Sequence, residues 1–421
     1  MKVIFLLGLK AKWSSLKHFF SKSNQIKLYM DNKVKSQNWN KITILELEEL
    51  ILFQLKALWD NGNQTSWKEN HKRKVSELVP PVMIWGPPGV GKSSVIRDIA
   101  HDLGVGYIDV RLAQREPIDI RGLPVPTDDG VHWHISAEWP RDPDSKGIII
   151  FDELTAADRT LQVAAYEFIL DRRLGDLYTV PEGWYIVGAG NRASDRAVAT
   201  TMSSALANRF LHVEIEPEVD AWIKWALRHN VHPLVTGFIR FKPNCFFTME
   251  DNLERGWPSP RSWERVSTML HLMEKNQSKN KRMLDISIEG LVGTGVGVEF
   301  NAYREWGGQI SDVLEMMLDT GRKVIIPQRA DQKYALCSAM VYHLWKGKSE
   351  KDQKALLDGF YRISIELSSD FAAMAMIDAM YGPNPDKIDY YSQMLLEHEL
   401  YSQWQKKHGS ALRKTMQAYA Q

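Results

Sequence analysis

The sequence contains little cysteine, no long apolar run and almost no net charge. Only two of its 421 residues are cysteines, Cys245 and Cys337. One disulfide is possible, but a disulfide framework is excluded, and a reducing compartment such as the cytoplasm is expected. The apolar run Val3–Leu9 is far shorter than the roughly 20 residues of a membrane-spanning helix, so we expect no membrane span. The 53 basic and 52 acidic residues leave a charge of +1, which indicates no class of partner.

The composition is that of a folded chain. Hydrophobic residues make up 44% and charged residues 25%, which excludes a wholly disordered protein. The 15 tryptophans indicate many large, rigid contacts. At about 150 residues per domain, the length predicts two or three domains.

Residues 1–74 are interpreted as a basic arm and a helix, partly disordered. The first 40 residues hold eight lysines and one acidic residue, Asp31, a local charge of +7. Such an arm could contact an anionic surface or nucleic acid, could be a disordered tail, or could precede a true start at Met30. The last two interpretations together are favoured. Apolar residues at helical spacing predict one amphipathic helix over 42–59.

The pattern changes at residue 82. Short apolar runs separated by helical patterns indicate a parallel sheet covered on both faces. We expect five strands, at Val82–Trp85, Tyr107–Leu112, Gly147–Phe151, Trp184–Val187 and Phe210–Ile215. After Pro217 the pattern is mainly helical to the last residue.

A glycine-rich loop follows the first of these strands. Residues 86–93 read Gly-Pro-Pro-Gly-Val-Gly-Lys-Ser and open a helical run, the context that a phosphate-binding loop requires. Backbone N–H groups of such a loop point at phosphate oxygens, and the helix N-terminus adds a positive dipole end. Lys92 is expected to reach the β- and γ-phosphates, and Ser93 to bind Mg²⁺. The predicted nucleotide-binding residues are Gly86, Pro87, Pro88, Gly89, Val90, Gly91, Lys92, Ser93 and Ser94.

Polar side chains end two later strands. Asp152 and Glu153 follow Gly147–Phe151, and Asn191 follows the strand that begins at Trp184. Ligands of open α/β sheets bind at these carboxyl ends. Asp152 can hold Mg²⁺, and Glu153 can orient an attacking water. Asn191 can bond the γ-phosphate or that water, or it can be a plain turn residue.

Together these motifs resemble the Walker A, Walker B and sensor 1 motifs of AAA+ ATPases, and among them the MoxR-like and dynein-related group. Leu206–Phe210 is similar to the L-x-x-R-F element of that family, with Arg209 in the arginine-finger position. Ser259-Pro260-Arg261 is similar to its sensor 2. The catalytic residues that the resemblance implies are Glu153, Asn191, Arg209 and Arg261, with Arg192 and Arg196 as weaker candidates.

The resemblance implies a P-loop α/β fold with a five-stranded parallel sheet. It covers about residues 75–300, with an ATPase core over 75–216 and a helical lid over 217–304. It does not explain the helical extension that the sequence pattern predicts over 305–421. It also implies ATP and Mg²⁺ as ligands and self-association into a ring, usually a hexamer. The implied partner is a protein substrate, for which a von Willebrand factor A-type domain is one candidate.

Two hairpins are expected between the strands. Asp129-Gly130 followed by alternating residues predicts the first, and turns at Gly175 and at Gly183 predict a second over 172–185. They resemble the helix-2 and pre-sensor-1 inserts of the family. Arg172 and Arg173 could contact substrate or lie on a charged surface.

The preferred function is therefore an ATP-hydrolysing ring protein that remodels or activates a partner protein, in the manner of a MoxR-like chaperone. One alternative is an NTPase motor associated with nucleic acid, which would need a basic groove with aromatic residues. Another is a scaffold that binds ATP without turnover. The presence of Glu153, Asn191 and Arg209 argues against the scaffold.

Overall fold

The computed structural model describes residues 41–60, 74–192, 202–249, 255–277, 280–307, 313–319, 321 and 324–419. The chain divides into Met1–Lys41 and Ile42–Gln421, and the account below concerns the second unit. The expected basic arm and the candidate Arg196 lie outside the described residues.

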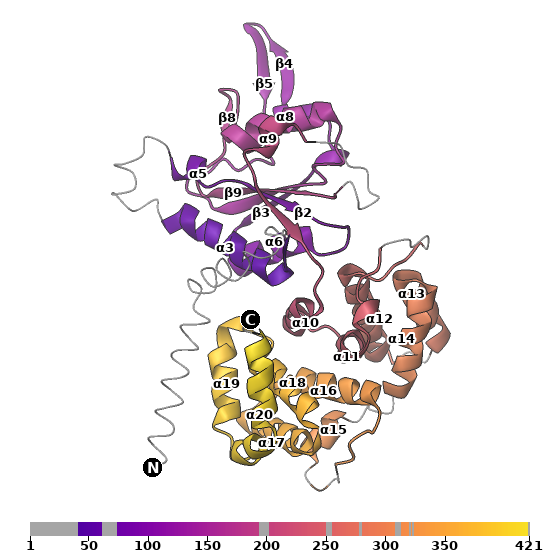
Figure 1. Cartoon of the computed structure of the whole chain (residues 1–421). Coiled ribbons are helices and arrows are strands. Elements are labelled where there is room, and N and C mark those ends of the chain that lie inside the picture. Colours follow the sequence, from indigo (N-terminus) through magenta and orange to yellow (C-terminus); the bar gives the residue numbers. More distant parts are fainter. Residues whose placement is uncertain are drawn as a thin grey trace. The chain divides into compact units, whose positions relative to one another are not determined.

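The expected parallel sheet is present (Figure 1). Its strand order is β1-β10-β2-β9-β6-β3, and the four pairings from β10 through to β3 are parallel. The strands span Lys41–Ile42 (β1), Val82–Trp85 (β2), Gly106–Arg111 (β3), Gly147–Asp152 (β6), Trp184–Gly190 (β9) and Leu211–Ile215 (β10). The five expected strands are confirmed to within a few residues. The sixth, β1, is a two-residue edge strand, and the Ile42 carbonyl accepts a hydrogen bond from the backbone of Glu216.

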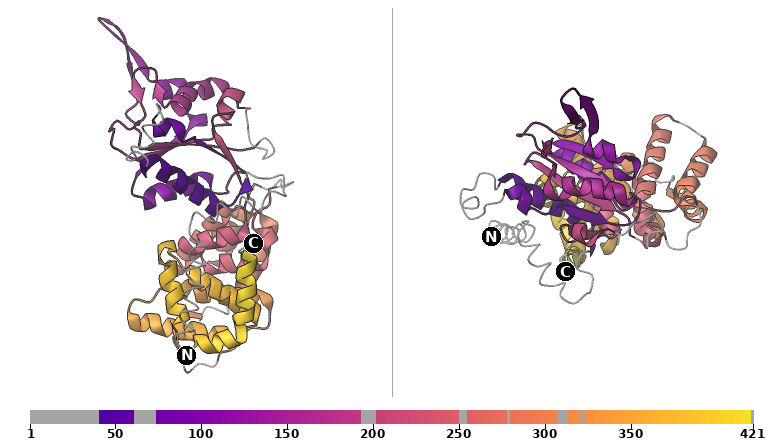
Figure 2. Two further views of the ribbon diagram at one scale, coloured as in Figure 1. Left: turned by 60° about the vertical axis from the view of Figure 1, so that its left-hand side comes forward. Right: turned by 90° about the horizontal axis from the view of Figure 1, so that it is seen from above.

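Helices cover both faces of the sheet (Figure 1 and Figure 2). On one face, α3 (Ile44–Asp60) and α6 (Lys92–Asp102) bury side chains such as Ile51 and Ile96 against the strands. On the other face, α8 (Arg159–Asp171), with α7 (Pro117–Arg121) and α9 (Ser204–Ala207), packs around Phe151 and Phe168. Alternate side chains of a strand reach opposite faces, so Ile148 and Ile150 join the first core while Ile149 and Phe151 join the second. The helix expected over 42–59 is confirmed as α3.

Both expected hairpins are present. The first consists of β4 (Leu123–Thr127) and β5 (Gly130–His134), and the second of β7 (Arg173–Leu174) and β8 (Tyr178–Thr179). The short helices α5 (Val75–Leu78) and η2 (Leu112–Gln114) complete this part. Leu123, Val131 and Trp133 of the first hairpin, and Leu177 at the turn of the second, are exposed apolar side chains. These side chains add nothing to the core.

Helices α10 to α14 surround an aromatic core. They span Val219–Arg228 (α10), Pro233–Phe241 (α11), Pro243–Cys245 (η4), Pro260–Lys275 (α12), Lys281–Val292 (α13) and Thr294–Gly307 (α14). Phe238, Trp263 and Phe300 are fully buried there and meet at ring-centroid distances of 5.2 to 5.5 Å. At such distances the rings interact beyond simple burial of area.

The remaining helices form a second helical cluster. They span Val313–Leu318 (α15), Ala330–Leu344 (α16), Glu350–Glu366 (α17), Ser369–Tyr381 (α18), Pro385–Lys387 (η6), Ile388–Leu396 (α19) and Tyr401–Tyr419 (α20). Met340, Met376 and Trp404 are fully buried in its core, so the methionine-rich pattern fills space between helices. Cys245 and Cys337 are both free and buried. No helix in the described ranges is long and apolar enough to cross a membrane.

One arginine connects the sheet layer to both helical clusters. Arg228, the last residue of α10, donates to Glu48 of α3 at 2.9 Å and to the Tyr381 hydroxyl at the end of α18. Arg240 of α11 also pairs with the buried Asp378 of α18 at 2.7 Å. Charged hydrogen bonds therefore join these layers.

The close approach of β3, β6 and β9 predicts a stability difference between two glycine substitutions. In Gly147→Ala the new Cβ would lie 2.5 Å from the Trp184 ring and 2.6 Å from the Gly106 carbonyl oxygen. Such overpacking costs about 1–3 kcal/mol, so the melting temperature should fall. In Gly290→Ala, within α13, the Cβ meets nothing within 4 Å, and the helix should gain about 0.5–1 kcal/mol. Thermal unfolding followed by circular dichroism measures both, and an unchanged melting temperature for Gly147→Ala would contradict the tight packing.

Candidate nucleotide-binding site

The glycine-rich loop connects β2 to α6 in the expected way. Gly86, Gly89 and Gly91 have φ angles of 156°, 84° and 98°, values that side-chain-bearing residues rarely adopt. Gly91 is the N-cap of α6. The N-terminus of an 11-residue helix, with its free N–H groups and positive dipole end, thus stands directly behind the loop.

Lys92 is buried and turned into the loop. Its Nζ donates to the carbonyl oxygens of Gly86 at 2.7 Å and Pro87 at 3.0 Å, and to Asn191 Oδ1 at 3.0 Å. A buried ammonium group needs such acceptors because burial removes its water. The lysine therefore links the loop to the strand next to it, β9.

Ser93 and Asp152 meet at the end of β6. The Ser93 hydroxyl donates to Asp152 Oδ2 at 2.5 Å, and Asp152 Oδ1 accepts from the Glu153 backbone N–H at 2.8 Å. Both carboxylate oxygens are therefore held in place. Glu153 has a φ of 56°, the left-handed region that is unfavourable for a residue with a side chain and that recurs at functional sites.

Asn191 is held by a residue that sequence reasoning missed. Buried Thr155 accepts from the Asn191 backbone N–H at 3.1 Å and donates to the Asn191 carbonyl at 3.3 Å. A Cβ on Gly190 would lie 2.7 Å from the Thr155 side chain, so glycine there permits the contact. Because 36 residues separate Thr155 from Asn191, only the pairing of β6 with β9 brings them together.

A second missed residue is Asp109 on β3. Its Oδ1 is buried and has no hydrogen-bond partner among the described residues. Burial, and next the charge of Asp152, raise the pKa of the Asp109 carboxyl above its ordinary value. In the sheet register Asp109 lies opposite Ile150, two residues before Asp152, so it adds negative charge on the same face of the sheet.

The start of α12 closes on the loop. The Arg261 N–H donates to the Gly89 carbonyl at 3.1 Å, and a Cβ on Gly89 would lie 3.0 Å from the Ser259 hydroxyl. Ser259 and Ser262 form a capping box at this helix end. The side chain of Arg261 is exposed.

The other arginine candidates have hydrogen-bond or ion-pair partners outside this cluster. Arg209 has a side chain that is 56% exposed and pairs with Asp171 of α8 at 3.6 Å. Arg192 donates to Glu214 of β10 at 2.5 Å. Arg172 is buried and donates to the carbonyls of Pro181 at 3.0 Å and Trp184 at 2.7 Å, so its side chain supports the hairpin, and the idea that it contacts substrate is wrong. Burial lowers the pKa of Arg172 to about 10.

The residues present fit a nucleotide with Mg²⁺. The loop provides positive-φ glycines and a buried ammonium group, and the hydroxyl and carboxylate oxygens of Ser93 and Asp152 are the hard ligands that Mg²⁺ prefers. Lys92 and the loop amides would hold phosphates, and Ser93 and Asp152 would hold the ion. These groups converge from β2, β6, β9 and α6.

Comparison with known proteins agrees with this arrangement. Residues 81–210 match the family model of the AAA domain, dynein-related subfamily. This part of the chain is an AAA+ ATPase domain. It contains the phosphate loop, Asp152, Asn191 and Arg209, and the sheet with its flanking helices is the P-loop AAA+ fold.

Individual relatives are distant. Midasin of Giardia intestinalis is 26% identical over an alignment of 144 residues, which covers 32% of this chain and 3% of that protein. Among solved structures, NtrX of Brucella abortus in complex with ADP has 14% identity and a TM-score of 0.31 over 79% of this chain and 70% of its own. A protein of Cytophaga hutchinsonii described as an ATPase has 11% identity and a TM-score of 0.27 over 91% and 89%.

The contacts of Lys92 predict a defect in nucleotide binding. Lys92→Ala should weaken the affinity for a fluorescent ATP analogue at least tenfold, because the loop loses its positive charge. Lys56→Ala, on the exposed face of α3, is the control and should bind like the parent. Equal affinity of the Lys92→Ala and parent proteins in a fluorescence titration would remove Lys92 from the site.

Proposed function

We propose that this chain is a Mg²⁺-dependent ATPase that assembles into a ring, such as a hexamer, and uses ATP hydrolysis to remodel or activate a partner protein, in the manner of MoxR-like chaperones. The observation that carries the proposal is the convergence of four polar residues at one edge of the sheet, where Lys92 donates to Asn191 and Ser93 donates to Asp152.

Glu153 is the proposed catalytic residue. It follows Asp152 directly, and its backbone is held in an unusual conformation by three contacts: its N–H donates to Asp152, and its carbonyl accepts from Ala156 at 2.8 Å and Ala157 at 3.3 Å. A carboxylate carried by a backbone fixed in this way can orient water and accept its proton. Bound Mg²⁺ would supply positive charge against the phosphate oxygens. Asn191 would orient the same water, and Arg261, at the start of α12, would sense the nucleotide.

Arg209 supports an assembly with shared sites. Its side chain points to the surface, where its ion-pair partner is Asp171 and not a residue of the phosphate loop. An exposed ion pair is worth little, so Asp171 could be exchanged for a phosphate at low cost. Arginine suits that role because its planar guanidinium binds phosphate with two hydrogen bonds. We therefore assign Arg209 to the site of the neighbouring subunit.

Exposed side chains on the two hairpins favour the proposal that the substrate is a protein. The hairpins expose Leu123, Val131, Trp133 and Leu177, of which Val131 and Trp133 share one face of the first hairpin, and exposed apolar side chains of this size can contact other proteins. A domain of the von Willebrand factor A type is one candidate partner.

Glu153 provides the direct test of hydrolysis. Glu153→Gln should lower steady-state ATP hydrolysis by about a hundredfold or more, while retaining binding of the fluorescent ATP analogue. Glu366→Gln, on an exposed position of α17, should behave like the parent. If the parent protein binds ATP but shows no turnover at any protein concentration, alone or with a partner, then the scaffold function is the correct one. Turnover retained in Glu153→Gln would show that another group activates the water.

Mixed assemblies test the assignment of Arg209. Lys92→Ala should abolish hydrolysis, and Arg209→Ala should lower the hydrolysis rate by about 10³-fold. Mixtures of the two should regain part of the activity, because a Lys92→Ala subunit still offers Arg209 to its neighbour. Arg173→Ala is the matched control, since that arginine is equally exposed and pairs with Glu167 at 3.5 Å. No regain in any mixture, with assemblies intact by size-exclusion chromatography, would argue for a site complete within one subunit.

A further inference from the structure

Three potential metal ligands meet where α11 begins and α12 ends. His232 is the N-cap of α11, and His271 and Glu274 lie one turn apart near the end of α12. Glu274 Oε1 lies 2.9 Å from His232 Nε2, and Glu274 Oε2 lies 3.8 Å from His271 Nδ1. One ligand atom from each residue can be chosen so that all three lie within 4.8 Å of one another.

The surrounding backbone orients both imidazole rings. His271 Nε2 donates to the Asn230 carbonyl at 3.0 Å, so the lone pair of this ring is on Nδ1, the atom closer to Glu274. A metal-binding histidine commonly donates its other ring N–H to a carbonyl in this way. The His232 backbone N–H donates to Ser267 of α12 at 2.8 Å, which fixes the start of α11 to the helix that carries the other two ligands.

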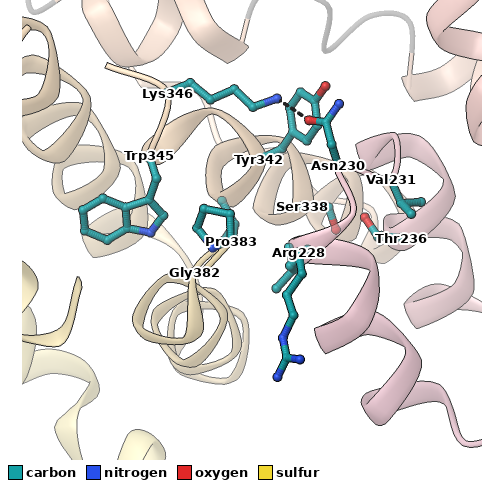
Figure 3. A pocket seen from close by; sticks show the side chains of 12 residues that line it. Arg228, Asn230, Val231, Thr236, Ser338, Tyr342, Trp345, Lys346, Gly382 and Pro383 are labelled. Atoms are coloured by element: carbon teal, nitrogen blue, oxygen red, sulfur yellow. Dashed lines mark hydrogen bonds between the residues drawn. The ribbon is translucent and has the colours of Figure 1, made fainter. Parts of the chain in front are cut away.

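The side chain of Asn230 also accepts a hydrogen bond from Lys346 (Figure 3). Lys346 Nζ donates to Asn230 Oδ1 at 2.8 Å and lies 3.1 Å from the centroid of the Tyr342 ring. Asn230 itself has a φ of 54°, a left-handed conformation that directs its carbonyl to His271 and its side chain to Lys346. The Lys346 ammonium group is therefore held by Asn230 and Tyr342, beside the cluster of His232, His271 and Glu274.

We propose that His232, His271 and Glu274 form a binding site for a divalent metal ion of the Zn²⁺ type. Two imidazole nitrogens and one carboxylate oxygen are a ligand set that Zn²⁺ accepts, with water in the fourth position. The side chains of His232 and Glu274 are 6% and 66% exposed, so the site is closed on the protein side and open to solvent at the carboxylate. This inference rests on no property of the nucleotide site.

Binding of the ion requires one proton rearrangement. His232 Nδ1 accepts from the Leu234 N–H at 3.2 Å, so without metal its Nε2 carries the proton and donates to Glu274. When Nε2 binds the ion, that proton leaves Nε2 and a proton occupies Nδ1, which ends the long cap to Leu234. Metal binding thus breaks two hydrogen bonds, the one from His232 to Glu274 and the one from the Leu234 N–H to His232. It forms three metal–ligand bonds in their place.

The site can be tested with Zn²⁺ alone on the full-length protein. After treatment with a chelator, the protein is titrated with Zn²⁺ in the presence of a chromophoric competitor. We expect one strong site, with affinity at least tenfold lower in His271→Ala and in Glu274→Gln. His101→Ala is the control, because that histidine is 87% exposed on α6, and it should keep the parent affinity.

Thermal unfolding of each variant, with and without Zn²⁺, shows whether the variant is folded and gives a second measure of Zn²⁺ binding. Zn²⁺ should raise the melting temperature of the parent and of His101→Ala, but not of Glu274→Gln, whose exposed side chain can be changed without loss of core packing. Absence of a one-equivalent site in the parent, or equal Zn²⁺ affinity in parent, His271→Ala and Glu274→Gln, would overturn the proposal and leave the three residues as a hydrogen-bonded joint between α11 and α12.

Discussion

The candidate site depends on the convergence of three adjacent parallel strands at their carboxyl ends. β2 ends in the glycine-rich loop, β9 in Asn191 and β6 in Asp152, and the register of these strands brings their ends to one edge. Two hydrogen bonds then tie α6 to the ends of β9 and β6: Lys92 reaches Asn191, and Ser93 reaches Asp152. If either strand shifted by one residue, its side chains would change faces, and the polar groups would no longer meet.

The same geometry explains why so many polar groups tolerate partial burial. Lys92 has three oxygen acceptors, two from the loop backbone and one from Asn191. Each of these acceptors is an oriented dipole, and together they replace hydrogen bonds to water that the ammonium group loses on burial.

The sequence was informative where the chemistry is local. The phosphate loop, its strand and its helix are contiguous, so Gly86 to Ser93 could be predicted from spacing alone. The five main strands were also predictable, since strands buried on both faces are continuous apolar runs. The two-residue strand β1 was missed because two residues carry no periodicity.

Residues that depend on distant partners could not be predicted. Thr155 supports Asn191 only after β6 and β9 pair, and Asp109 lies near Asp152 only because β3 joins the same sheet. Arg172 occurs in a charged stretch typical of a surface, yet its guanidinium is buried under the hairpin carbonyls. His232 lies 39 residues before His271, with no motif that connects them. In each case the deciding fact is a tertiary contact.

Arg228 shares its guanidinium between Glu48 of α3 and Tyr381 of α18, while α10, to which it belongs, leads from the sheet into the helical clusters. Helix α3 itself packs against the glycine-rich loop. The Cδ1 atom of Ile44, at the start of α3, lies 3.4 Å from the position that a Cβ atom on Gly91 would take. A rotation of α10 away from α3 would therefore separate Arg228 from Glu48 and leave a partly buried cation without that carboxylate. Through this one side chain, a change of angle between the distal helices and the wall of the nucleotide site carries an energetic cost.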